Sequence, residues 1–203
     1  MVRYSEQPGL WESINDLSRE VWPEYNRHGQ TMNQYWNQLY DVFPEWQFVL
    51  YDSQDEVVLA EANTVPVGWD GTDAGLGPGI DATLAAAFDL HAAGGQPTAA
   101  CALAAQIPPR NQGKRLSGVL LQAMSGLARD AGLNRLIAPV RPSHKVRYPT
   151  IPIDRYARWT RPDGTTFDPW MRVHTQLGAR IGPAIPHSLF ITGTVGNGNR
   201  GRR

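Results

Sequence analysis

Hydrophobic side chains recur at helical spacing in the first part of the chain. Residues 11–22 and residues 31–43 each place most of their apolar groups along one face, three or four positions apart. This is the period of an amphipathic helix, so both segments are predicted to be helices. Pro23 is expected to end or kink the first, because its ring clashes with the preceding turn.

Three further helices are predicted farther along the chain. The clearest is 117–131, whose apolar residues fall on one face and whose C-cap is Gly132. A helix over 82–93 is expected to be capped by Asp81. A helix over 168–177 begins at an Asp-Pro pair, which places proline at the first helical position.

Strands are predicted where short apolar runs are bounded by turn residues. The first two runs are joined by the turn sequence Asp-Ser-Gln-Asp and form a hairpin. The third is rich in alanine and also fits a helix, but two prolines and a glycine-bearing loop close it. The predicted strands are 47–51, 57–67, 98–107, 136–140 and 188–195.

The order of these elements predicts a mixed α/β or α+β domain. Residues 68–79 are a glycine-rich loop, and residues 141–167 are an irregular excursion rich in proline and arginine. The chain contains neither an internal repeat nor a long linker, so we expect one domain over 1–195 and a flexible tail over 196–203.

Composition narrows the class of protein. The chain has 203 residues, of which 41% are hydrophobic, with seven Trp, seven Tyr and five Phe, too many aromatic groups for a disordered chain. No apolar run approaches the roughly 18 residues that span a bilayer, and the first residues lack the apolar core of a secretory signal. The lone Cys101 lies in an apolar run. We expect a cytoplasmic domain without membrane contact.

A zero net charge conceals a strong asymmetry between the two halves. Residues 1–105 hold 3 basic and 15 acidic side chains, a balance of −12, and residues 106–203 hold 16 basic and 4 acidic ones, a balance of +12. This distribution favours an anionic ligand on the C-terminal half. The alternative is that the two halves neutralise each other where they pack.

The stretch 107–124 carries the most informative chemistry. A strand leads into a loop that opens an amphipathic helix, and free N–H groups at a helix start bind anions. Gly113 allows close approach of the backbone to a ligand. Three cations crowd the same turn, Arg110, Lys114 and Arg115, although cations at a helix N-terminus are unfavourable. A bound phosphate would explain them; solvated surface charges are the alternative.

This stretch resembles the pyrophosphate loop of the GNAT superfamily of acyl-CoA-dependent acyltransferases. That loop reads Gln/Arg-x-x-Gly-x-Gly/Ala and precedes a helix with a leucine pair. When Leu120 and Leu121 are set on that pair, Gln112 falls on the first position, Arg115 on the first glycine and Ser117 on the second. One of the three positions is therefore kept and one is conservatively changed.

The surrounding order of elements supports the resemblance. Residues 98–195 follow the family's central strand–loop–helix–strand–helix order, and residues 11–67 match its first helices and strands. Residues 170–179 resemble the family's later helix, often written Tyr-Glu-Lys-Leu-Gly-Phe. Segments 70–97 and 141–167 are longer than a minimal member needs and resemble extended actinobacterial members. The resemblance implies a mostly antiparallel twisted sheet flanked by helices.

The resemblance also implies where an acyl-CoA would bind. The pyrophosphate would lie on the amides from Gly113 to Ser117, and the pantetheine arm would pair with the strand near Ala105 and Ile107. A side chain at Arg115, a glycine position in the family, either blocks the backbone or holds a phosphate in a bidentate manner. The implied residues are Ala105, Ile107, Gln112, Gly113, Lys114, Arg115, Leu116 and Ser117.

The same comparison implies candidates for catalysis and for the acceptor. Many family members use a tyrosine on the later helix to reprotonate the departing thiolate, and His174 occupies that place, four positions before Gly178. The strand 98–107 offers no acid, so a base would be His174, water or a carboxylate from elsewhere. Tyr35, Trp36 and Arg141 are predicted to contact the acceptor, and Arg141 could instead hold the 3′-phosphate of CoA. A packed histidine, a core aromatic face and a solvated arginine are the alternatives.

Other kinds of site are poorly supported. Residues 75–79 have the wrong glycine spacing for a dinucleotide loop, no Cys/His cluster has metal spacing, and Ser117 lacks a nucleophile-elbow context. We therefore predict transfer of an acetyl or other acyl group from acyl-CoA to a small-molecule amine, by direct attack and without a metal. A catalytically silent domain that binds an acyl-CoA, acyl carrier or metabolite is the first alternative. An arginine-rich nucleic-acid-binding module is the second, although the acidic half disfavours it. The oligomeric state, a homodimer included, stays open.

Overall fold

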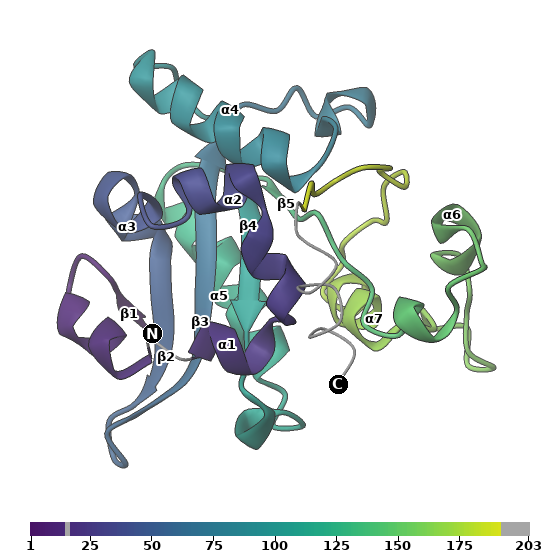
Figure 1. The fold of residues 1–203 in the computed structure, drawn as a ribbon, viewed down its shortest axis with the longest axis horizontal. Helices are drawn as coiled ribbons and strands as arrows, with labels where there is room; N and C mark the ends of the chain where they lie inside the picture. The colour runs from purple at the N-terminus through teal and green to yellow at the C-terminus, as the bar shows by residue number, and fades with distance from the viewer. Residues whose placement is uncertain (15–16, 192–203) are drawn as a thin grey trace.

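The computed structural model describes residues 1–14 and 17–191 and is built on one five-stranded sheet (Figure 1). The strand order is β1-β2-β3-β4-β5. Strands β1 to β4 each pair with the next strand in an antiparallel direction, whereas β5 lies parallel to β4. The strands are β1 (Val2–Arg3), β2 (Gln47–Asp52), β3 (Val57–Val67), β4 (Ala99–Gln106) and β5 (Leu136–Ile137).

Helices cover both faces of this sheet. The α-helices are α1 (Leu17–Val21), α2 (Gln30–Tyr35), α3 (Leu39–Val42), α4 (Ile80–Ala92), α5 (Leu116–Asp130), α6 (Ile153–Tyr156) and α7 (Pro169–Gln176). Short 3-10 helices add η1 (Pro8–Ile14), η2 (Glu24–His28), η3 (Pro44–Trp46), η4 (Ala74–Leu76), η5 (Pro109–Asn111) and η6 (Lys145–Arg147). Helices α2, α3 and α4 pack on one face, and α5 and α7 pack on the other.

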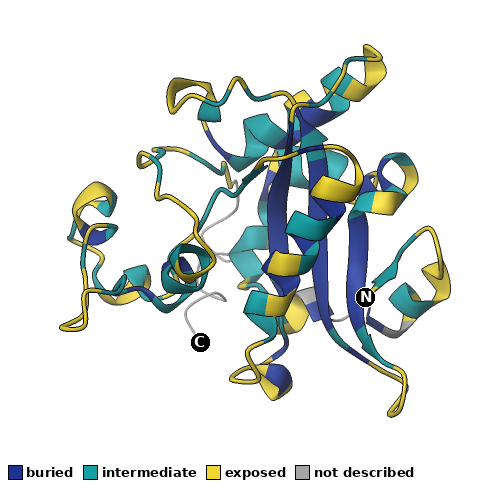
Figure 2. Ribbon diagram, turned by 180° about the vertical axis from the view of Figure 1, so that it is seen from behind, coloured by how far each residue is buried: buried dark blue, intermediate teal, exposed yellow. Residues whose placement is uncertain are grey.

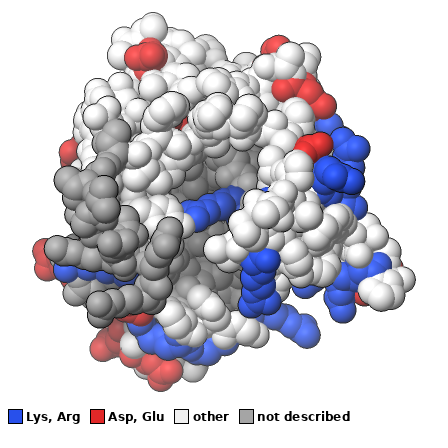
Figure 3. Space-filling model, turned by 45° about the vertical axis from the view of Figure 1, so that its right-hand side comes forward, with Lys and Arg blue, Asp and Glu red and all other residues white. Residues whose placement is uncertain are grey.

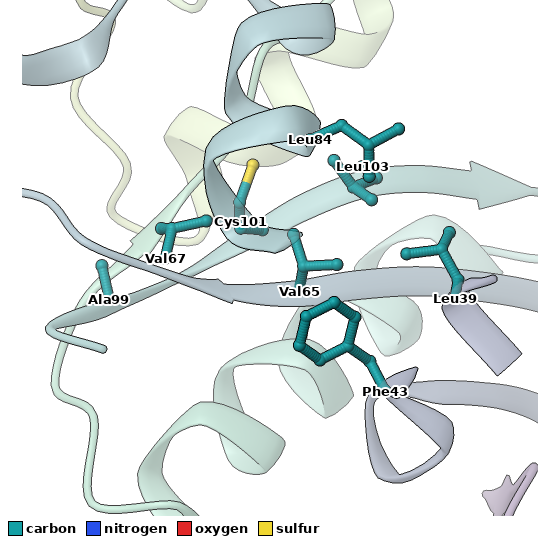
Figure 4. Packing of buried hydrophobic residues seen from close by; sticks show 9 residues of the cluster. Leu39, Phe43, Val65, Val67, Leu84, Ala99, Cys101 and Leu103 are labelled. Atoms are coloured by element: carbon teal, nitrogen blue, oxygen red, sulfur yellow. The ribbon is translucent and has the colours of Figure 1, made fainter. Parts of the chain in front are cut away.

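The sheet's core residues explain this layering. On the first face, aliphatic and aromatic groups from β3, β4, α3 and α4 interlock (Figure 4); they include Leu39, Phe43, Val65, Val67, Leu84, Ala99, Cys101 and Leu103. On the second face, Ala60, Ala62 and Ala102 give a flat surface against which α5 packs its leucines and Met124. Both faces of the central strands are therefore buried, as the dark strands in Figure 2 show.

The region after β5 is ordered by its own small core rather than by the sheet. Four aromatic rings pack edge to face or tilted around α6: Tyr148, Tyr156, Trp159 and Phe167. Asp168 caps α7 by accepting from Trp170 N and Met171 N, and it also accepts from the Tyr156 hydroxyl. Burial alone would raise the pKa of Asp168, but these hydrogen bonds and those from the backbone of 143–144 hold it below its usual value.

Most predicted elements are confirmed. The hairpin of 47–51 and 57–67 and the strand 98–107 match β2, β3 and β4 within a residue or two, and the helices 82–93, 117–131 and 168–177 match α4, α5 and α7. The predicted strand 136–140 is wrong in length, because pairing with β4 stops after Ile137.

The two N-terminal helices are wrong as single elements. Residues 11–22 divide into part of η1 and the short α1, with residues 15 and 16 outside the described part. Residues 31–43 divide into α2 and α3 around a turn at 36–38, because the apolar face must bend to follow the twisted sheet.

Two terminal predictions also need correction. Asp81 is not the cap of α4, which begins at Ile80; its carboxylate instead accepts from Phe190 N at 2.9 Å. The strand 188–195 is wrong in its described part, where 188–191 shows only an isolated bridge from Ile191 to Gly29. Residues 192–195 and the predicted tail 196–203 lie outside the described residues, so the domain division stays a prediction. Within the described chain, no helix is both long and apolar enough to cross a membrane.

Candidate functional site

Strands β4 and β5 separate at one end of the sheet. Strand β4 pairs with β5 only through Ala100 and Cys101, whereas its pairing with β3 continues to Gln106. The register also shifts so that Leu103 has no partner on β3. From Leu103 onward, the β5 side of β4 is therefore an open strand edge, and such an edge can pair with an extended ligand.

The loop after β4 presents free backbone donors beside this edge. In the described part of the chain, none of the N–H groups from Gly113 to Ser117 has a hydrogen-bond partner. They precede α5, a helix of 15 residues, so its positive end adds to their effect. Gly113 has φ 80° and Arg115 has φ 61°, both in the left-handed region. The backbone at Arg115 thus keeps a conformation that favours glycine, the residue that the motif predicts there.

The predicted cationic side chains surround these donors. Arg110, Lys114 and Arg115 are all exposed. The Arg110 guanidinium pairs with Glu20 of α1 at 2.5 Å, and Lys114 Nζ donates to Asn111 Oδ1 at 2.8 Å. Among the described residues Arg115 has no ion-pair or hydrogen-bond partner, which leaves its guanidinium available to a phosphate. Gln112 is exposed as well, and its amide donates to the carbonyl of Ile107.

The segment from α1 to η2 lies over the end of β4. It is attached on both sides of the gap between β4 and β5, which is called the opening below. Glu20 holds the loop through Arg110 on one side. On the other side, Arg141 donates to Tyr25 Oη and to Asn26 Oδ1 and lies over the Tyr25 ring. Figure 3 looks onto this side of the molecule and shows a hollow with basic atoms inside it. Arg141 therefore contacts the α1–η2 segment, and its contact with an acceptor stays a prediction.

A buried polar network occupies the same face of β3 and β4. Glu61 is 4% exposed; its Oε1 accepts from Trp11 Nε1 at 2.9 Å and from the Tyr40 hydroxyl at 2.6 Å, and its Oε2 accepts from Gln106 Nε2 at 3.1 Å. Asn63 joins through the Tyr40 and Gln106 side chains. Burial raises the pKa of the Glu61 carboxyl, although the hydrogen bonds from Tyr40, Trp11 and Asn63 oppose this.

Sequence reasoning missed this network. Its members come from four distant segments, and the only local signal is the pair Glu61 and Asn63 at inward positions of an otherwise apolar strand. The buried Glu61 pairs across the sheet with Gln106, the last residue of β4. The base, which the sequence left open among His174, water and a carboxylate from elsewhere, stays a prediction.

His174 lies on α7 with an unusual environment. Its ring packs edge to face on Trp170 with centroids 4.5 Å apart, and its Nε2 is buried without a hydrogen-bond partner among the described residues. Burial lowers the pKa of His174 to about 4, so its imidazole is neutral at pH 7. A neutral imidazole can accept a proton but is not a charged acid.

The predicted aromatic contacts lie in a different environment. Tyr35 stacks on Phe88 of α4 with ring centroids 4.7 Å apart, and both Tyr35 and Trp36 pack against the core between α2 and α4. Their part in acceptor binding stays a prediction, because this packing already accounts for much of their apolar surface. Cys101 is fully buried, and burial raises its pKa to about 12, so its thiol is protonated and inert. The described residues contain no cluster of His, Cys, Asp and Glu able to hold a metal.

The charge asymmetry is only partly neutralised by packing. The two halves meet in the described ion pairs Glu20–Arg110, Asp73–Arg180 and Arg3–Asp130. These are surface pairs, which contribute little stability. The acidic half supplies β1–β3 and α1–α4, and the basic half supplies the loop with free amides and α5–α7.

A mostly antiparallel sheet whose fourth and fifth strands separate beside an amide-rich loop and helix defines the GNAT fold. Two solved structures share it. The chain matches the loading GNATL domain of CurA from Lyngbya majuscula with a TM-score of 0.61, 16% identity and coverage of 91% of this chain and 90% of that one. It matches the GphF GNAT-like decarboxylase in complex with isobutyryl-CoA with a TM-score of 0.63, 17% identity and coverage of 87% and 85%.

Sequence comparison adds one curated relative. The arginine N-acetyltransferase avaD of Aspergillus versicolor is 27% identical over 202 residues, which covers 91% of this chain and 69% of that protein. No family model matches the chain. The solved structures confirm the predicted GNAT-like fold, and the curated N-acetyltransferase supports the family predicted from the sequence, the GNAT acyl-CoA-dependent acyltransferases.

Proposed function

We propose that the protein transfers an acetyl or other acyl group from acyl-CoA to an amine of a small molecule by direct attack. The observation that carries this proposal is the run of free N–H groups from Gly113 to Ser117 beside the open edge of β4. Free donors at a helix start suit a diphosphate, and an open strand edge suits the amide-bearing pantetheine arm.

The residues fit an acyl-CoA on electrostatic grounds as well. Arg115 is unpaired and exposed beside the loop, and Arg110 and Lys114 add two more charges. Guanidinium groups bind phosphate oxygens in a bidentate manner. In this arrangement the thioester carbonyl would lie along Leu103 to Gln106, on the strand edge that β5 leaves open. No metal is required by the proposed step.

The acceptor is proposed to be a basic amine such as L-arginine. The support for this acceptor is the name of the curated relative, an arginine N-acetyltransferase. Arg141, which already reaches Tyr25 and Asn26 across the opening, would bind a carboxylate of the acceptor.

The proposed step is an acyl transfer from a thioester to an amine. The amine nitrogen attacks the thioester carbon, the C–S bond breaks, and the product is an amide and a CoA thiol. One proton must leave the nitrogen and one must reach the sulfur. His174 is proposed to accept the proton from the nitrogen and to pass it to the sulfur. Its imidazole is neutral at pH 7, and its Nε2 has no partner in the described structure.

The test is a turnover assay with acetyl-CoA and a panel of amines that includes L-arginine, L-lysine and agmatine. Thiol release should depend on the amine, and mass spectrometry should show one added acetyl group on it. Calorimetry with acetyl-CoA alone gives the binding step. A protein that neither binds acetyl-CoA at millimolar concentration nor releases thiol would overturn the proposal.

A second candidate function has a specific observation in its favour. The two solved structures named above carry the names of other roles, a loading domain and a decarboxylase, and Arg115 stands where the family loop has a glycine. The second candidate is therefore a domain that binds an acyl-CoA or acyl carrier without acylating an amine. Binding of acetyl-CoA without transfer to any amine of the panel would favour it.

A further inference from the structure

The side-chain amide of Gln106 has a fixed orientation at the open end of β4. Gln106 is the last residue of that strand and is 1% exposed. Its Nε2 donates to Glu61 Oε2 and to Asn63 Oδ1, both at 3.1 Å. Because these partners only accept, the amide nitrogen must face them, and the carbonyl oxygen must face the opposite way.

The side-chain carbonyl oxygen of Gln106 has a hydrogen-bond partner, Trp22, in the structure. Trp22 Nε1 donates to Gln106 Oε1 at 3.0 Å. Trp22 follows α1 in the segment that Glu20 and Tyr25 attach to the two sides of the opening. An indole N–H therefore covers the one acceptor atom that the network directs toward the α1–η2 segment.

Stability does not explain why a carboxylate is retained behind Gln106. Glu61 is bonded by neutral donors, Trp11, Tyr40 and Gln106, and no described Lys, Arg or His pairs with it. A buried carboxylate without a cation is costly, and an apolar side chain of similar volume would be cheaper. The carboxylate instead orients Gln106, because Glu61 and Asn63 together hold its side-chain amide in one of two possible orientations.

From this geometry we infer that Gln106 binds the acceptor's reacting amine through Oε1, that Glu61 positions it, and that the Trp22 indole N–H fills the place of that amine. Amine N–H groups are donors, as the indole N–H is, so one hydrogen bond replaces another when the acceptor enters. The inference rests on the proposed function and names the residues that receive its acceptor.

Two substitutions separate this role from a structural one. Trp22→Phe keeps the ring and removes only the competing N–H, so the acceptor KM should fall about threefold to tenfold. Glu61→Gln frees the Gln106 amide to flip, so the acceptor KM should rise about tenfold. Affinity for acetyl-CoA should stay within about twofold in both variants, since neither side chain belongs to the loop.

Trp69→Phe is the matched control. Trp69 Nε1 donates to the Thr72 carbonyl in the loop before α4, so this variant loses one indole hydrogen bond away from β4 and should leave the acceptor KM unchanged. A second readout is the indole ¹H–¹⁵N resonance of Trp22, assigned by its absence in Trp22→Phe. It should shift when the acceptor amine is added to the complex with CoA.

The outcomes distinguish this inference from the proposed function. A wild-type protein that turns over an amine, with an acceptor KM that is unchanged or higher in Trp22→Phe and a Trp22 resonance that does not move, would overturn the inference alone. A wild-type protein that neither binds acetyl-CoA nor acylates an amine would overturn the proposed function, and the inference with it. A lower KM in Trp22→Phe supports both, because a merely structural bond would not improve binding when lost.

Discussion

The loop over 110–117 and the network around Glu61 lie at the same end of β4 and are built in opposite ways. The loop has exposed cations and free amides. The network is buried, and its carboxylate is bonded by donors from three other segments. The loop amides have no hydrogen-bond partner in the described part of the chain, whereas the polar groups of the network bond to one another. Substitutions in the loop should therefore weaken ligand binding, and substitutions in the network should weaken the fold.

The largest effect is expected at Glu61. Glu61→Ala leaves the donors of Trp11, Tyr40 and Gln106 buried without an acceptor, which should lower the free energy of unfolding by about 3–5 kcal/mol. Urea denaturation followed by tryptophan fluorescence measures this. A urea midpoint equal to that of the wild type would show that the network does not stabilise the fold. The network and the loop would then not differ in the way described here.

His174 combines features of both regions, because its Nε2 is buried like the network and unpaired like the loop amides. If it carries the proton, His174→Gln should lower kcat by roughly a hundredfold. His174→Tyr, which restores the residue that resembles the family pattern, should retain most of the rate. Equal rates in wild type and His174→Gln would remove His174 from the mechanism.

The same histidine predicts a pH dependence of stability. Burial lowers the pKa of His174 from 6.5 to about 4 in the folded protein. Its contribution to stability is therefore fully present above pH 6.5 and is lost as pH falls from 6.5 toward 4. Thermal melting of wild type and His174→Gln across this range should converge at low pH. Parallel curves throughout would contradict the lowered pKa.

Arg115 tests the loop side of the contrast. Arg115→Glu reverses the charge beside the free amides and should raise the Kd for acetyl-CoA about tenfold to thirtyfold. The melting temperature should not fall, since a carboxylate is favourable at a helix start. Arg129→Glu, the same charge change in the last turn of α5, is the control and should leave the Kd within about twofold. Equal affinities in both variants would mean that the loop holds no phosphate.

The smallest effect is expected at Arg141, whose contacts with Tyr25 and Asn26 are exposed. Arg141→Gln should raise the KM of an acceptor that carries a carboxylate about threefold, with no change for its decarboxylated analogue. L-Arginine and agmatine form that pair. If instead the Kd for acetyl-CoA rises and that for dephospho-CoA does not, Arg141 binds the 3′-phosphate of CoA.

The contrast also explains what could be predicted from the sequence. The loop's residues are consecutive, so a glycine, three cations and a following amphipathic helix identify it without the fold. Residues 57–67 and 117–131 are likewise local patterns, and β3 and α5 confirm them. Glu61 could not be found this way, since its donors come from Trp11, Tyr40 and Gln106.

The wrong predictions have the same origin in long-range packing. Residues 31–43 have helical spacing, yet a turn at 36–38 divides them into α2 and α3. Ser188 follows a strand pattern, but its hydroxyl accepts from Ile80 N at the start of α4 instead of leading into a sheet strand. In each case a local period was correct about which residues are apolar and wrong about the element, because distant contacts chose the backbone conformation.

The most direct test of the central claim is a backbone amide ¹H–¹⁵N titration with acetyl-CoA. The largest saturable shifts are expected on Gly113 to Ser117, which carry the free amides, and on Leu103 to Gln106, which form the open strand edge. Amides in those two segments that stay in place while others move, or that never respond at millimolar acetyl-CoA, would contradict that claim.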